Sequence, residues 1–439
     1  MRSPWPRSGL WRHGDFLRLW SAETVSQLGT QVSLLALPLA AILVLDASAF
    51  EVALLGVFEF MPFILISLPA GVWVDRLPRR PILVIADLGR AATLASVPLA
   101  YAFDSLTIWQ LYGVGLVTGI LTVFFDVAYQ SYLPSLVNRD QLVEGNAKLE
   151  VSRAGAQIGG PAFAGGLVEA VAAPTAILVD AVSFLLSALF LFRIRKRETV
   201  ATAEAVERAG MRRELGEGLR YVLGHRLLRP IAACTGSANF FGSIAFSILL
   251  VFCVRDLGLS PGLIGIALAL GNVGWLLAAV SATRISQRFG VGRTIVGSAV
   301  LFGVAWLPVP AAPDGNAALP FLIGAVVIGG FGSVVYNITQ VSLRQAIAPE
   351  RIQGRMNAVM RFLVWGTLPL GSLVGGALAS SIGLRETLWI SAIGGALTFL
   401  PVLFSPVRSV LVIPDVSEEE GDAPPLLEAP APAPRYGDV

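Results

Sequence analysis

The sequence predicts an all-α integral membrane protein with about twelve transmembrane helices, arranged as two pseudo-symmetric six-helix bundles. The first observation is composition: 55% of the residues are hydrophobic and only 14% are charged, whereas an ordinary soluble domain carries about 25% charged residues. The second is length, because 439 residues have room for a dozen spans of about 20 residues each. The third is that the apolar segments form two groups of six.

The first group predicts an N-terminal bundle over residues 16–192, preceded by a cytoplasmic segment at 1–15. Each of its apolar segments is bounded by charged residues or by residues that favour turns. The six segments are 16–45, 52–74, 81–103, 106–132, 149–171 and 175–192.

The second group predicts a C-terminal bundle over residues 230–404. Its six segments are 230–254, 262–283, 294–310, 318–343, 356–381 and 384–404. A charged linker at 193–229, which opens with RIRKRE, separates the bundles and is expected to be partly helical. The tail at 405–439 is rich in proline and acidic residues, and we expect it to be disordered because it buries too little apolar surface.

The distribution of basic residues predicts the orientation in the cell membrane. If the N-terminus is cytoplasmic, 28 of the 32 Lys and Arg residues flank the spans on the inner side, and only Arg255 and Arg385 lie outside. Basic residues next to membrane spans are retained in the cytoplasm. Both termini and the linker are therefore expected on the cytoplasmic side.

The loop between the second and third segments, GVWVDRLPRRPIL at 71–83, concentrates charge at the cytoplasmic boundary. Gly71 permits close approach of two helices, and Asp75 can cap the following helix or pair with an arginine. Arg79 and Arg80 are expected to stay at the anionic inner leaflet. A loop that serves only to orient the helices remains an alternative.

The fifth segment contains GAQIGGPAFAGG at 155–166, a run of small residues around one proline. Pro161 removes a backbone hydrogen bond and favours a kink, and small residues allow a neighbouring helix to approach closely. We expect a close contact between the bundles at Pro161 and Gly165, although a general packing face is also possible. The glycines of this motif are Gly155, Gly159, Gly160, Gly165 and Gly166.

Carboxylates inside the apolar segments are costly in a membrane, so each is a candidate functional group. Glu59, Glu23 and Asp126 are the candidates for binding a coupling proton or a cationic substrate, and Glu59 lies deepest within its segment. Asp180 also lies inside a span. A structural hydrogen-bonding role stays open for each of them.

Two further carboxylates are each followed by an arginine three positions later. Asp87 precedes Arg90, and Glu150 precedes Arg153. This spacing places the two side chains on one helix face, so we interpret both as structural ion pairs.

Enzyme chemistry finds no support in the sequence. There is no GxxxxGK[ST] phosphate-binding loop and no metal-ligand spacing, and the two histidines, His13 and His225, lie in cytoplasmic flanks. A serine-histidine-aspartate set cannot be assembled from them. We therefore expect no enzyme activity, no cofactor, no metal and no nucleic-acid partner.

The loop at 71–83 resembles the signature loop of the major facilitator superfamily, which has Gly, three residues, Asp-Arg, then Gly and two basic residues. Pro78 stands where the family usually has Gly. The segment at 155–166 resembles the antiporter motif of family exporters, with three residues rather than two between Pro161 and the glycine pair. From 15 to 404 the chain is similar to the branch that contains macrolide efflux proteins and siderophore exporters.

This resemblance implies a monomeric exporter that moves a small molecule across the lipid bilayer in exchange for protons, by alternating access. The cargo would be a drug, a macrolide-like compound or a siderophore-like metabolite. The resemblance also implies a cytoplasmic latch, in which the loop's acid and second arginine meet an acidic residue of the fourth helix. Its residues here would be Gly71, Asp75, Arg76, Arg79, Arg80 and Asp126.

Two other functions remain open, namely uptake of a metabolite and a membrane sensor without transport, because a fold alone does not fix a function. A transporter is expected to line its central axis with polar and aromatic residues, whereas a sensor would pack that axis shut. The candidates for lining a substrate cavity are Gln27, Gln31, Tyr129, Asn239, Asn272, Tyr336 and Asn337.

Overall fold

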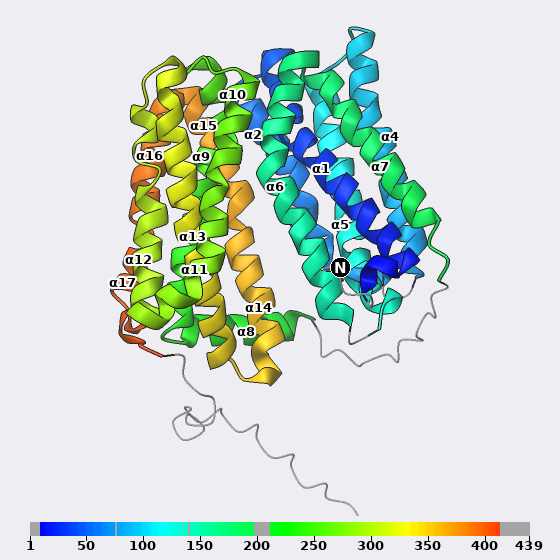
Figure 1. Ribbon diagram of the computed structural model, residues 1–439. Helices are drawn as coiled ribbons and strands as arrows, with labels where there is room; N and C mark the ends of the chain where they lie inside the picture. Colours follow the sequence, from blue (N-terminus) through cyan, green and yellow to red (C-terminus); the bar gives the residue numbers. More distant parts are fainter. Residues whose placement is uncertain (1–8, 75–76, 139–140, 197–210, 413–439) are drawn as a thin grey trace, which may run out of the picture.

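The computed structural model describes residues 9–74, 77–138, 141–196 and 211–412. Within these ranges the chain forms two groups of helices that lie side by side (Figure 1). The N-terminal half, from blue to green in the figure, makes one group, and the C-terminal half, from green to orange, makes the other.

The N-terminal group contains the first six predicted segments. A short 3-10 helix, η1 (Leu10–Arg12), precedes it. The second predicted segment is divided at Ile66 into two helices, α2 and α3. The helices are α1 (Gly14–Leu43), α2 (Ala49–Leu65), α3 (Ser67–Val74), α4 (Arg79–Ala102), α5 (Ile108–Leu136), α6 (Leu142–Val171) and α7 (Ala173–Phe192).

The C-terminal group contains the other six predicted segments. Two of them are also divided: the eighth at Asn272 and the eleventh at Gly366. The helices are α9 (Leu228–Arg255), α10 (Pro261–Gly271), α11 (Val273–Phe289), α12 (Val291–Val304), α13 (Leu319–Ile347), α14 (Glu350–Trp365), α15 (Thr367–Ile382), α16 (Leu384–Ala396) and α17 (Leu400–Leu403). Short 3-10 helices are η3 (Val309–Ala311), η4 (Gly315–Ala318) and η5 (Pro406–Ser409).

Each of the twelve predicted segments thus corresponds to one helix or to a broken pair. In the described part of the chain, ten helical stretches are long and apolar enough to cross a membrane. The second predicted segment falls outside this count; its helices α2 and α3 have 17 and 8 residues. The fifth, α6, also falls outside it: Glu144, Lys148, Glu150 and Arg153 lie in its first half, and its second half is rich in glycine.

Helix starts at the end remote from the linker are encoded locally. Ser48 and Glu51 form a capping box at the start of α2, in which the Ser48 backbone N–H donates to Glu51 Oε2 at 2.8 Å. Thr107 and Ser260 accept backbone hydrogen bonds at the starts of α5 and α10. These side chains satisfy N–H groups that the first helical turn leaves unpaired.

The linker also contains a helix, as expected. This helix, α8 (Met211–Gly224), packs against α14 and lies across the lower end of the C-terminal bundle (Figure 1). Arg355 of α14 pairs with Glu217 at 2.5 Å, and the hydroxyl of Tyr221 donates to the Ile347 carbonyl at 3.2 Å. The linker is therefore anchored to the C-terminal bundle.

The predicted disorder of the tail does not extend to its first residues. After α17 the chain forms η5, in which Val407 is fully buried, and the Gly292 N–H at the start of α12 donates to the Val410 carbonyl at 2.7 Å. The prediction of disorder was based on the acidic, proline-rich composition of the whole tail, which does not apply to its short apolar stretch PVRSVLV. Residues 413–439 lie outside the described residues.

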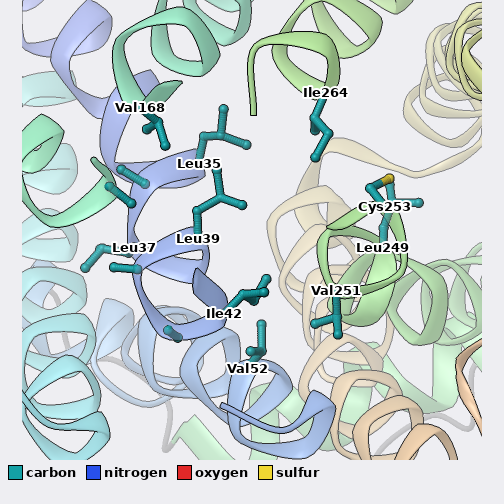
Figure 2. Packing of buried hydrophobic residues seen from close by; sticks show 14 of the residues in the cluster. Leu35, Leu37, Leu39, Ile42, Val52, Val168, Leu249, Val251, Cys253 and Ile264 are labelled. Atoms are coloured by element: carbon teal, nitrogen blue, oxygen red, sulfur yellow. The ribbon is translucent and has the colours of Figure 1, made fainter. Parts of the chain in front are cut away.

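The two bundles touch at the end remote from the linker and diverge toward the linker end (Figure 1). One apolar cluster at the closed end includes residues of both bundles. Figure 2 shows its core from close by, with residues of α1 and α2 opposite residues of α9 and α10. Those labelled include Leu35, Leu39, Ile42, Val52, Leu249, Val251 and Ile264.

Candidate functional site

A buried arginine lies at the centre of the N-terminal bundle. Arg90 of α4 is 4% exposed and forms an ion pair with Asp87, one turn earlier on the same helix. Its guanidinium lies between the rings of Phe125 from α5 and Phe184 from α7, at 4.3 and 4.1 Å from the ring centroids. Cation–π contacts on a desolvated guanidinium hold it in place.

Carboxylates from four helices converge on this arginine. Glu23 of α1 interacts electrostatically with Arg90, Asp87 and Asp126. Asp180 of α7 interacts with Arg90 and Asp87 and accepts a hydrogen bond from Ser183 at 3.0 Å. We call the five residues the Arg90 cluster: Glu23, Asp87, Arg90, Asp126 and Asp180.

The Arg90 cluster contains more acid than base. Its four carboxylates share one guanidinium, and a second cation, Arg153 of α6, lies near Asp126. Like charges in a low-dielectric interior oppose one another, and an unpaired buried charge is strongly disfavoured. Four negative charges at once are therefore strongly disfavoured in this cluster.

The members of the cluster differ in exposure. The Asp126 side chain is exposed, whereas Glu23 is 7% exposed and Asp180 and Asp87 are almost fully buried. Asp126 thus connects the surface of the bundle to its buried acids.

Two of the predicted cavity residues belong to the surroundings of this cluster. Gln27 donates its side-chain N–H to Glu23 Oε1 at 2.8 Å. Tyr129 stacks on Phe125, with ring centroids 5.9 Å apart, and lies within electrostatic range of Glu23. Among the described residues neither Tyr129 OH nor Glu23 Oε2 has a hydrogen-bond partner, so both can form a hydrogen bond with a ligand group.

Glu59, the candidate deepest in its apolar segment, lies elsewhere. It is half-buried on α2 where that helix meets α5. A Cβ placed on Gly115 of α5 would lie 3.1 Å from Glu59 Cγ, and one on Gly119 would touch the Glu59 carbonyl. Within the described chain no charged side chain accompanies Glu59. It is therefore separate from the Arg90 cluster.

The small residues of α6 face two different neighbours. A Cβ on Gly165 would overlap the Pro261 carbonyl and lie 3.0 Å from the Cα of Gly265 on α10, and one on Gly265 would overlap the Pro161 carbonyl. A Cβ on Gly160 would instead overlap Gln31 of α1. The other glycines of the motif have nothing within 4 Å of a Cβ, namely Gly155, Gly159 and Gly166.

Hydrogen bonds join the bundles around the Gly165 contact. Asn272, at the break between α10 and α11, donates to the Gln157 carbonyl of α6 at 2.5 Å. Glu169 of α6 accepts from the Gly262 N–H at 2.9 Å, at the start of α10. Asn272 thus serves the contact between bundles in this conformation, whereas the sequence predicted it to line a cavity.

Three other predicted cavity residues lie together in the C-terminal bundle. Asn239 of α9 and Tyr336 and Asn337 of α13 line a cavity of about 390 Å³. The predicted cavity residues therefore do not line one axis. Gln27 and Tyr129 lie beside the Arg90 cluster, Gln31 packs against Gly160 of α6, Asn272 lies at the contact between bundles, and the other three line this C-terminal cavity.

The predicted cytoplasmic latch is only partly visible. Asp75 and Arg76 lie outside the described residues, and a Cβ on Gly71 would have nothing within 4 Å. Arg80 donates from Nε to the Leu191 carbonyl at 3.1 Å, which ties the start of α4 to the end of α7. The predicted latch would hold the linker end of the bundles closed, whereas here the bundles are closed at the other end. The interaction of Asp126 with Arg79 therefore stays a prediction.

Comparisons with known proteins agree with this architecture. The family of transmembrane secretion effectors matches residues 8–431. The multidrug efflux pump Tap of Mycolicibacterium fortuitum is 26% identical over 410 residues, which cover 89% of this chain and 97% of that pump.

Two solved structures share the fold. The nucleoside transporter NupG has a TM-score of 0.72 at 13% identity, covering 89% of this chain and 98% of that one. A bacterial homologue of the iron transporter ferroportin, in its inward-facing state, has a TM-score of 0.70 at 19% identity, covering 90% and 99%. The predicted twelve-helix fold is confirmed, and the chain belongs to the transmembrane secretion effector family of the major facilitator superfamily, whose members span the membrane many times and transport small molecules.

Proposed function

We propose that the protein exports a small molecule from the cell in exchange for protons. The excess of carboxylates in the Arg90 cluster is the observation that supports proton coupling most directly, because such a group gains and loses protons as its surroundings change. Export is supported by the similarity to Tap, a multidrug efflux pump. The cargo is a small molecule, and the protein acts as a monomer.

We infer the orientation from the basic residues, which place the linker in the cytoplasm. The end closed by Gly165 and Gly265 then faces outward, and the conformation is inward-facing. Asp126 lies ten residues before the end of α5, in its cytoplasmic half. It is therefore the acid through which the Arg90 cluster exchanges protons with the cytoplasm.

Transport requires the outer contact to open. In the proposed cycle the cargo enters from the cytoplasm, the bundles rock, and the contacts at Gly165 and Asn272 separate. Protons then enter the Arg90 cluster from outside, and the bundles return. Arg90 itself stays fixed between Phe125 and Phe184, so that the charge of the cluster changes only through its acids.

A flux screen in proteoliposomes tests the proposal. Lipophilic drugs and siderophores would be offered with and without an imposed pH gradient. A gradient that accelerates movement of at least one compound out of the cytoplasmic side supports export. Acceleration only in the opposite direction would indicate metabolite uptake, and no movement of any compound would favour a sensor.

The topology is open to direct labelling. We choose Glu217 of the linker helix α8, which is partly exposed, and replace it with cysteine in a background without Cys234 and Cys253. An impermeant maleimide should label Glu217→Cys in inverted vesicles and spare it in intact cells. Labelling in intact cells would place the linker outside and reverse the proposed orientation.

We expect Glu23→Gln to uncouple cargo movement from the pH gradient. The amide cannot exchange a proton, so flux should fall to the rate seen without a gradient, while cargo binding stays measurable. Glu59→Gln is the matched comparison, because Glu59 is also a membrane carboxylate but lies outside the Arg90 cluster. Loss of stimulation in Glu59→Gln alone would assign coupling to the α2–α5 contact instead.

A further inference from the structure

The cavity in the C-terminal bundle is lined entirely by uncharged residues. It lies between α9, α11, α12, α13, α14 and α16, and its volume of about 390 Å³ falls in the range of small-molecule sites. Three of the nine tryptophans of the chain line it, together with Phe302 and Tyr336. The tryptophans are Trp275, Trp306 and Trp365.

Two of these tryptophans pack closely against glycines of α13. A Cβ on Gly329 would lie 3.1 Å from Trp306 Nε1, and a Cβ on Gly330 would overlap the indole of Trp275. Any larger residue at either position would displace a ring. Adjacent glycines of one helix therefore hold two indole rings beside the cavity.

The polar groups of the cavity have defined orientations. Asn239 donates one amide N–H to the Val364 carbonyl at 3.0 Å, which leaves its oxygen and its second N–H for a ligand. Asn337 accepts from Gln340 at 3.0 Å, so its amide N–H is the donor that it can offer. The hydroxyl of Tyr336 is held 2.8 Å from Thr235 Oγ1. The indole N–H groups of Trp275 and Trp306 add two hydrogen-bond donors to the wall of the cavity.

Two broken helices border this cavity and connect it to the contact between bundles. Trp365 is the last residue of α14, directly before the break at Gly366. Trp275 lies three residues after the break at Asn272, whose side chain bonds to Gln157 of the N-terminal bundle. If the bundles separate, the bond of Asn272 to Gln157 breaks, and the position of Trp275 in the wall of the cavity can change. Discontinuous helices form the substrate sites of many secondary transporters.

We propose that this cavity binds the cargo, and that the cargo presents an uncharged, flat ring system with hydrogen-bond acceptors. Aromatic side chains stack on flat rings, and the donors of the cavity match carbonyl or ether oxygens. A charged group would lose its hydration without gaining a counter-charge. The inference rests on the proposed export function and separates the two tasks: the N-terminal bundle binds protons and the C-terminal bundle binds cargo.

Equilibrium dialysis of the purified full-length protein in detergent tests this assignment. The probes share one ring and differ in charge: uncharged methoxycoumarin, its acetic acid derivative, which is an anion at neutral pH, and its trimethylammonium derivative, a cation. We expect the uncharged probe to bind at least about tenfold more tightly than either ion. Equal binding of the three probes, or preference for an ion, would contradict the assignment.

Variants locate the binding. Trp306→Leu removes a stacking surface, and Ser333→Phe fills the cavity without removing any tryptophan. Both should weaken methoxycoumarin binding at least about tenfold, while Trp389→Leu, which changes a tryptophan of α16 away from the cavity, should bind as the wild type does. Unchanged binding in Ser333→Phe would overturn the proposal even if Trp306→Leu fails to fold.

Flux measurements distinguish this proposal from the proposed function. If methoxycoumarin binds as predicted but no compound moves in proteoliposomes, export is contradicted and the cavity remains a binding site. If a compound moves under a pH gradient equally well in the wild type and in Ser333→Phe, export stands and the cargo site lies elsewhere.

Discussion

Replacing Gly165 with leucine is expected to abolish transport while the protein still inserts into the membrane. The side chain would meet the Pro261 carbonyl and the Cα of Gly265, which are backbone atoms and cannot rotate away. Overpacking costs about 1–3 kcal/mol, and each 1.4 kcal/mol changes an equilibrium about tenfold. This contact exists only when the outer end is closed. The substitution therefore destabilises the inward-facing state relative to the outward-facing state.

The initial rate of efflux, normalised to the protein found in the membrane, measures this effect, and we expect a loss of at least about tenfold. Gly166→Leu is the matched control, since a Cβ on Gly166 has nothing within 4 Å and the residue is exposed. A reporter cysteine near Asn272 should become more accessible from outside in Gly165→Leu. Equal transport by the two variants would mean that the bundles do not close on this glycine.

Replacing Arg90 with methionine is expected to be the most destabilising single change in the N-terminal bundle. Methionine retains an apolar side chain between Phe125 and Phe184 but removes the charge that faces Asp87. Removing one partner of a buried ion pair costs about 3–5 kcal/mol. The unfolding temperature measured in detergent should decrease by a large amount. The double variant Arg90→Met/Asp87→Asn should recover part of that decrease.

Arg18→Met provides the comparison for this prediction. Arg18 pairs with Asp15 at 2.5 Å near the start of α1, where it is 30% exposed, and such surface pairs contribute about 0–1 kcal/mol. Arg90→Met should therefore unfold at a clearly lower temperature than Arg18→Met. Equal unfolding temperatures, or no recovery in the double variant, would show that Arg90 does not balance the buried acids.

The helices could be predicted because their signal is local. Runs of apolar residues bounded by charges identify membrane spans, and all twelve predicted segments proved helical. Two of the three breaks carry a local signal, because Pro69 follows Ile66 and Pro369 follows Gly366 by three residues, and each proline removes a backbone hydrogen bond of the helix. No proline or charge marks the break at Asn272, whose side chain bonds to the opposite bundle. The burial of Val407 depends in the same way on α12.

The candidate site was only partly accessible from the sequence. Glu23 and Asp126 stand out as carboxylates in apolar segments, but Arg90 was interpreted as the structural partner of Asp87. The ion pair exists, and the spacing that predicts it says nothing about acids on three other helices. A basic residue inside an apolar span was the available signal. The spacing of residues within one segment does not predict the C-terminal cavity either, because its tryptophans come from segments that are distant in the sequence.

The central claim is that cargo movement and proton movement are coupled through the Arg90 cluster. Coupling is reciprocal, so a cargo gradient alone must move protons. Proteoliposomes loaded with a compound from the flux screen and a lumenal pH dye would be diluted into compound-free buffer at equal pH. The wild type should acidify the lumen as cargo leaves, and Glu23→Gln should not. Cargo efflux by the wild type without any change in lumenal pH would contradict the account.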